Sequence, residues 1–142
     1  MKKQFVTYEI ALALEELGFN EPCFGFYVSN VIGNAFSLIQ NGIGFKTNLE
    51  LTADTHISAP LWQQVIDWFE EKHDITVTNR KFFNHAYQIY IPQKNKEAKL
   101  IVTGLHQTSR IKAINDGILV AIEMVKNRQI NEKAIELCQK KK

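Results

Sequence analysis

The sequence predicts an α+β domain in which antiparallel strands pack on helices, and three observations support this fold class. Apolar residues recur with helical spacing from Ser58 to His73, a segment that holds both tryptophans. Apolar and polar residues alternate from Ala86 to Ile91, as in a strand with one buried face. A longer helical pattern runs from Ser109 to Asn127. The predicted order is helix, strands, helix, three strands, long helix and short helix.

Length and composition are those of one folded domain, which we place at residues 1–142. Of the 142 residues, 45% are hydrophobic and 23% are charged, enough to bury a core. The net charge of +2 is too small to indicate nucleic acid by itself. The uncharged stretch 22–45 is too polar and too rich in turn residues for a membrane helix. Cys23 and Cys138 lie far apart, which predicts a cytoplasmic protein with reduced thiols.

The first third of the chain predicts one helix followed by strands. Thr7 is placed to cap a helix that Gly18 ends, because a threonine hydroxyl satisfies free N–H groups and glycine adopts positive φ. The aromatic run 23–28 predicts a strand. The dipeptide Asn41-Gly42 suits a type I′ turn and predicts a hairpin.

The segment with the two tryptophans predicts the central helix of the fold. We expect a loop over 49–57, an N-cap at Ser58 and Pro60 in the first turn of the helix. Steps of ~100° per residue place Trp62 and Trp68 on one broad apolar face. That face buries a large aromatic area and therefore predicts the centre of the core.

The second half predicts three strands, at 75–78, 86–91 and 99–103, and then two helices. In the long helix 109–127, Gly117 costs ~1 kcal/mol relative to alanine, so another backbone is expected to pack closely there. Asn131 is expected to cap a separate short helix whose small apolar face contains Ala134, Ile135 and Cys138.

Residue patterns that mark catalytic or metal sites do not occur in the sequence. The four histidines, at 56, 73, 85 and 106, lack the close spacing of a zinc site, and neither cysteine has a basic neighbour that would activate a thiolate. There is no nucleophile elbow and no glycine-rich phosphate loop. We therefore predict no catalytic residue, no metal ligand and no cofactor, and a protein without enzymatic activity is favoured over an enzyme.

Basic residues in predicted turns and at one helix start are the candidates for nucleic-acid binding. Two aromatic residues, Phe82 and Phe83, follow one basic pair, and such mixtures can bind nucleic acid. The small net charge favours the alternative, in which these side chains are solvated and the aromatic rings are buried. The candidates are Arg80, Lys81, Lys94, Lys96, Arg110 and Lys112.

The long helix carries a second apolar flank that a monomer must cover or leave exposed. One interpretation is a homodimer in which a second copy packs against small residues of this flank. The other is intramolecular cover by the short C-terminal helix. The interface candidates are Ala113, Gly117, Val120 and Met124.

Three segments resemble a family of short hypothetical proteins from anaerobic gut bacteria, their phages and mobile elements. The segments are 5–14 (Phe-Val-Thr-Tyr-Glu-Ile-Ala-Leu-Ala-Leu), 23–27 (Cys-Phe-Gly-Phe-Tyr) and 59–69, which contains Trp62 and Trp68. The likeness covers the first half of the chain well and the second half loosely. It implies a mobile-element setting and no particular chemistry.

The element order over 58–127, helix, three strands, helix, is similar to a double-stranded RNA-binding domain. The resemblance places residues 84–87 at a groove-reading loop and residues 109–113 at a helix start that grips phosphates. Ile111 and Ile114 occupy positions where lysines are expected in that family. The leading interpretation is therefore a small accessory or binding protein of a phage or mobile element that acts through protein contacts. A nucleic-acid-binding module is the alternative.

Overall fold

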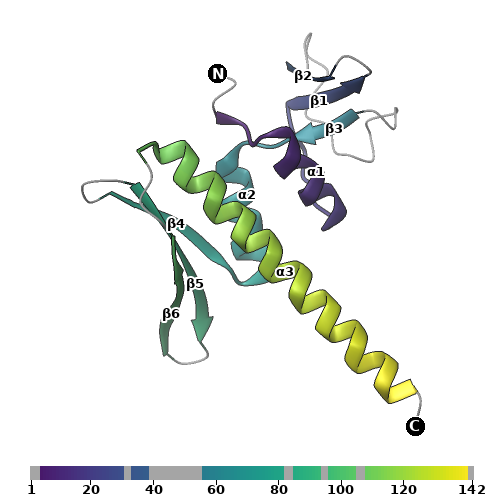
Figure 1. The fold of residues 1–142 in the computed structure, drawn as a ribbon, viewed down its shortest axis with the longest axis vertical. Coiled ribbons are helices and arrows are strands. Elements are labelled where there is room, and N and C mark those ends of the chain that lie inside the picture. The colour runs from purple at the N-terminus through teal and green to yellow at the C-terminus, as the bar shows by residue number, and fades with distance from the viewer. Residues whose placement is uncertain are drawn as a thin grey trace.

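The computed structural model describes residues 4–30, 33–38, 56–81, 85–93, 96–104 and 108–140 (Figure 1). These residues form three helices and two antiparallel three-stranded sheets, so the predicted α+β class is confirmed. Within them, no helix is both long enough and apolar enough to cross a membrane. The elements are α1 (Tyr8–Glu16), β1 (Gly25–Asn30), β2 (Gly33–Leu38), β3 (His56–Ala59), α2 (Trp62–His73), β4 (Thr76–Lys81), β5 (His85–Gln93), β6 (Lys96–Thr103) and α3 (Arg110–Lys140).

The first sheet has the strand order β2-β1-β3, and α1 contacts β3. The predicted cap of α1 is confirmed, since Ile10 N donates to Thr7 Oγ1 at 3.4 Å and Gly18 follows the helix with φ of 88°. The hairpin predicted at Asn41-Gly42 lies outside the described residues.

The predicted start of α2 was wrong by several residues. Ser58 lies in β3, where it pairs with Phe26, and α2 begins at Trp62. Pairing with β1 places in a strand the residues that local sequence signals assign to a loop and a helix cap. Gln64 supplies the missing cap, because its Oε1 accepts from Leu61 N at 3.0 Å.

The second sheet has the strand order β4-β5-β6, and α3 packs against β4 and β5. Val77 pairs with Ile89, which pairs with Val102, so these three side chains share one face of the sheet. Together with α2, these elements form the predicted order helix, three strands, helix.

A single helix replaces the two predicted at the C-terminus. α3 runs without a break from Arg110 to Lys140, through Asn131, which was expected to cap a new helix. Glutamate, lysine, glutamine, alanine and leucine dominate residues 128–140 and favour helix, whereas one asparagine costs only a fraction of a kcal/mol. α3 therefore extends well beyond the rest of the molecule (Figure 1).

One cluster of buried side chains joins both sheets and all three helices. Trp68 is 6% exposed and packs edge-on against Phe19 and Phe69, which confirms that the tryptophan helix contributes to the core. Trp62 is half-buried at the border of this cluster. Gly117 is closely packed, but by side chains and not by the backbone that was predicted, since a Cβ there would lie 2.9 Å from Tyr87 Cβ and 3.0 Å from Val77 Cγ1.

Candidate functional site

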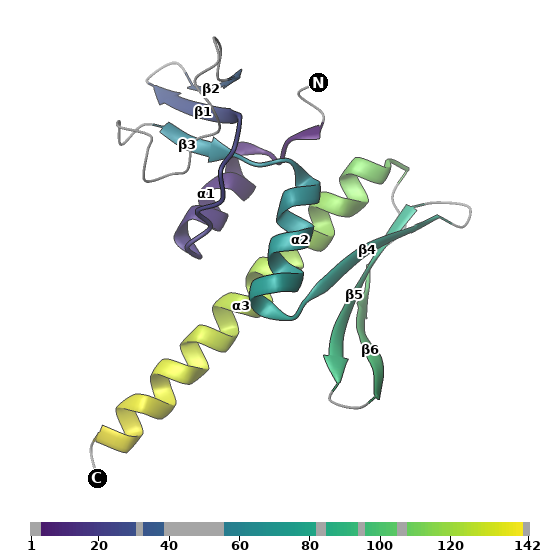
Figure 2. The ribbon, with the colours of Figure 1, turned by 180° about the vertical axis from the view of Figure 1, so that it is seen from behind.

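The C-terminal end of α3 projects from the body of the molecule (Figures 1 and 2). Its last described polar contacts with the body come from Lys126, whose Nζ lies 3.0 Å from Glu16 Oε2, and from Arg128, whose Nη1 donates to His73 O at 2.8 Å. Every residue from Ile130 to Gln139 is exposed. We call residues 130–139 the projecting segment.

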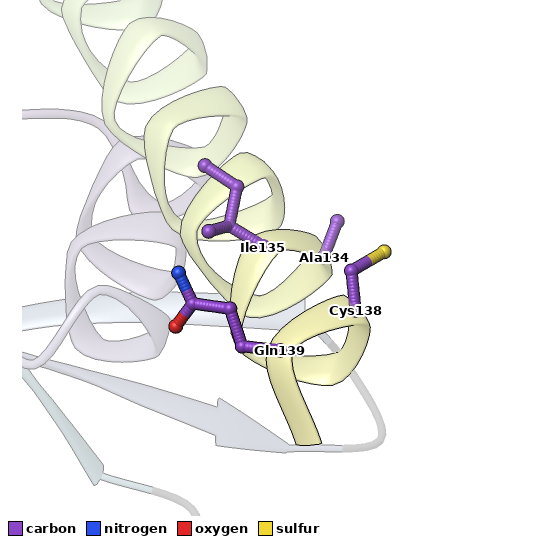
Figure 3. A pocket seen from close by; sticks show the side chains of 4 residues that line it. All are labelled: Ala134, Ile135, Cys138 and Gln139. Atoms are coloured by element: carbon purple, nitrogen blue, oxygen red, sulfur yellow. The ribbon is translucent and has the colours of Figure 1, made fainter. Parts of the chain in front are cut away.

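The projecting segment is amphipathic. At ~100° per residue, its large apolar side chains and two small ones fall on one broad face. Ile130 is 63% exposed, Ile135 58% and Leu137 61%. Figure 3 shows the four residues that line a shallow hollow of about 280 Å³, Ala134, Ile135, Cys138 and Gln139. Glu132, Lys133, Glu136 and Gln139 take the rest of the circumference, and Asn131 lies within the apolar arc, between Cys138 and Ile135.

The apolar face of the projecting segment is not a continuation of the face that α3 buries in the core. Ile114, Ile118, Ile122 and Val125 are each at most 2% exposed and make one stripe. Counting ~100° per residue, the apolar face of 130–139 lies on roughly the opposite side of the helix. The apolar side of α3 therefore changes where the helix leaves the body, so this second face cannot be an extension of the chain's own core.

The four residues predicted as a dimer interface lie within the body of the molecule. Ala113 and Gly117 are buried, and Gly117 packs on Tyr87 and Val77 of the same chain. Val120 and Met124 are half-buried against the core cluster. Ala113 and Gly117 are therefore covered by the chain itself, while an interface through Val120 and Met124 stays a prediction. Sequence reasoning missed Ile130 and Leu137, whose spacing with Ala134 was the available signal.

The basic residues predicted to bind nucleic acid do not form a uniformly basic surface. Arg80 and Lys81 are exposed at the end of β4, and Arg110 and Lys112 are exposed at the start of α3. Lys94 and the side chain of Lys96 lie outside the described residues. The guanidinium carbon of Arg110 lies 5.2 Å from the centre of a Trp62 ring, a cation–π distance.

A groove between α2 and β4 brings Arg110 together with two carboxylates. Trp62, Asp67 and Glu70 of α2, residues 76–79 of β4 and Arg110 line it. Asp67 and Glu70 are exposed, so a phosphate backbone entering the groove would approach two negative charges. The groove is therefore poorly suited to nucleic acid.

The titratable side chains of the described residues form no obvious reaction centre. Burial, followed by the charge of Glu21, raises the pKa of the Cys23 thiol to about 12, so this cysteine is unreactive. Cys138 is exposed on the apolar face of the projecting segment. Among the described residues, no three His, Cys, Asp or Glu side chains lie close enough together to hold a metal ion.

Comparisons with known proteins assign no function to these surfaces. No family model matches the sequence, and no match was found among the curated proteins or the solved structures.

Proposed function

We propose that this chain is a non-enzymatic binding protein that acts through helix-to-helix contacts of the projecting segment, and that its first partner is a second copy of itself. The observation that carries the proposal is the exposed apolar face of residues 130–139. The segment continues a helix that the body of the molecule already holds, and packing against a partner would bury the apolar side chains that these last turns expose.

A second copy fits this face because a two-fold axis buries the same apolar residues on both chains at once. Ala134 and Cys138 are small and allow two helix axes to approach closely, while Ile130, Ile135 and Leu137 flank them. The exposed carboxylates and Lys133 remain on the outer side, in water.

Nucleic-acid binding ranks second. The residues that favour it are Arg80, Lys81, Arg110 and Lys112, all exposed. Asp67 and Glu70, which line the same groove as Arg110, weigh against it. The phage or mobile-element setting stays a prediction from resemblance.

Light scattering over a wide dilution series tests self-association. We expect a monomer–dimer equilibrium that Ile135→Glu combined with Leu137→Glu weakens by at least about tenfold, because two charges would enter a desolvated contact. The matched control, Glu132→Gln with Glu136→Gln, changes the polar side of the same turns and should leave the equilibrium nearly unchanged. A wild-type protein that stays monomeric at every concentration contradicts the proposal.

The two cysteines provide an independent measurement on the unmodified chain. Cys138 is exposed on the proposed contact face, whereas Cys23 is buried, so a thiol reagent reports on Cys138. Its reaction should slow as the protein concentration rises and dimer forms. A rate that does not depend on concentration while light scattering reports a dimer would place the interface elsewhere.

A further inference from the structure

The groove between α2 and β4 runs along a free strand edge. β4 is an outer strand of the second sheet, and within the described part of the chain it pairs with β5 alone. Four consecutive residues, 76–79, line the groove. Because side chains alternate between the two faces of a strand, four in a row line one groove only along the strand's edge. Every second residue of such an edge directs its N–H and C=O groups away from the sheet.

The walls of the groove are formed by elements that diverge. α2 and β4 leave their short connection at Asp74 and Ile75 and separate, with the N-terminal half of α3 behind them (Figure 2). Glu70 lies near the end of α2 and Thr76 begins β4, so both line the end at which these elements join. Trp62 and Arg110 begin their helices and line the other end.

We propose that this groove binds an extended peptide segment of another protein, which adds a strand to the free edge of β4 and places a lysine or arginine against Asp67 and Glu70. In strand addition the backbone hydrogen bonds supply affinity, and the facing wall selects side chains. Here the facing wall is α2, whose half-buried Trp62 and Ile66 contact apolar side chains of the peptide.

The charges and the size of the groove favour this occupant. Asp67 and Glu70 are exposed carboxylates, and Arg110 stacks on Trp62 at the far end, so a basic side chain near the connection is complementary. The volume is about 280 Å³, slightly below the roughly 300–1,000 Å³ of sites that enclose small molecules. The groove is open to solvent, so an extended segment can lie along it with part of its surface outside.

This inference is independent of the projecting segment, because no residue from 130 to 139 lines the groove. The double variant Ile135→Glu with Leu137→Glu should therefore bind peptide as the wild type does. Loss of self-association and loss of peptide binding can be told apart in the same set of proteins.

Backbone amide NMR of the full chain tests the proposal with the synthetic peptide Thr-Val-Lys-Val-Thr-Val, whose β-branched residues favour an extended backbone. We expect saturable shifts centred on residues 76–79. Asp67→Asn combined with Glu70→Gln should weaken binding about three- to tenfold. Glu71→Gln, an exposed carboxylate on α2 outside the groove, is the matched control and should change affinity by less than about twofold.

Two further probes decide between occupants. The same peptide with every backbone nitrogen methylated cannot donate to a strand edge, and it should not bind. An RNA duplex of about 16 base pairs should not shift residues 76–79. The proposal is overturned by shifts confined to other residues, by equal binding of the methylated peptide, by an unchanged affinity of the charge variant, or by RNA occupying the groove.

Discussion

The two ends of α3 have similar apolar residues and opposite surroundings. From Ile114 to Val125 the isoleucines and valine are buried among α1, α2 and the second sheet. From Ile130 to Gln139 the side chains are all exposed. The helix is continuous, but the core ends inside it. An apolar stripe on a helix therefore indicates a contact, but it does not indicate whether that contact is intramolecular or intermolecular.

The largest expected difference between the two ends is in the free energy of unfolding. Ile118→Ala should cost about 2–5 kcal/mol, because it leaves a cavity at a fully buried site. Ile135→Ala removes the same atoms from an exposed site and should change the stability of the monomer by no more than about 0.5 kcal/mol. Urea denaturation at low protein concentration measures both. Equal losses would mean that the projecting segment packs on the body.

The two ends of α3 should also differ in how much an added side chain destabilises the protein, because Gly117 is closely packed. Gly117→Leu should destabilise the protein by about 1–3 kcal/mol or more, since even a Cβ would lie 2.9 Å from Tyr87 Cβ. Asn131→Leu places the same side chain at an exposed position of the same helix and should be nearly neutral. A Gly117→Leu variant as stable as the wild type would contradict the close contact between α3 and β5.

The smallest of these effects is the pH dependence at the border between the two ends, where Arg128 contacts the end of α2. Burial, and then the charge of Arg128, lowers the pKa of His73 from its ordinary value of 6.5. The unfolded chain therefore binds the proton more readily than the folded chain. This contribution to stability is fully present above pH 6.5 and is lost as the pH falls toward the lowered folded pKa.

Thermal unfolding between about pH 8 and pH 5.5 measures this dependence. His73→Gln should flatten the curve, because glutamine does not titrate. A wild-type curve with no decline below pH 6.5, or a variant with an unchanged decline, would show that His73 is not the responsible group.

Local chemistry explains what could be predicted from the sequence. The threonine cap and positive-φ glycine around α1 and the tryptophan face of α2 each depend on a few neighbouring residues, and each was confirmed. Three strands were also predicted where β4, β5 and β6 lie, at 75–78, 86–91 and 99–103, the second of them from alternation.

The two boundary errors have different physical causes, one a distant strand partner and the other the helix propensity of neighbouring residues. Ser58 is a good helix cap, but pairing with Phe26 of β1 places it in a strand. Asn131 is a good cap too, but strong helix formers on both sides continue α3 through it.

The sequence indicated the small apolar face of Ala134, Ile135 and Cys138, but neither the groove nor the exposure of that face could be predicted from it. The residues 76–79 look like those of any short strand, and only the strand order places β4 at an edge. The exposure of Ile135 depends on where the body ends, which is set by tertiary packing.

The position of α3 at the end of the described chain has a consequence for folding during synthesis. Ile114, Ile118 and Ile122 belong to the cluster that joins both sheets, so the earlier elements cannot bury their apolar faces until these residues have left the ribosome. Domains generally fold as units once their chain is available. The nascent chain therefore exposes Phe69, Val77 and Ile89 until Ile114, Ile118 and Ile122 have emerged, and this interval is when chaperone binding would matter most.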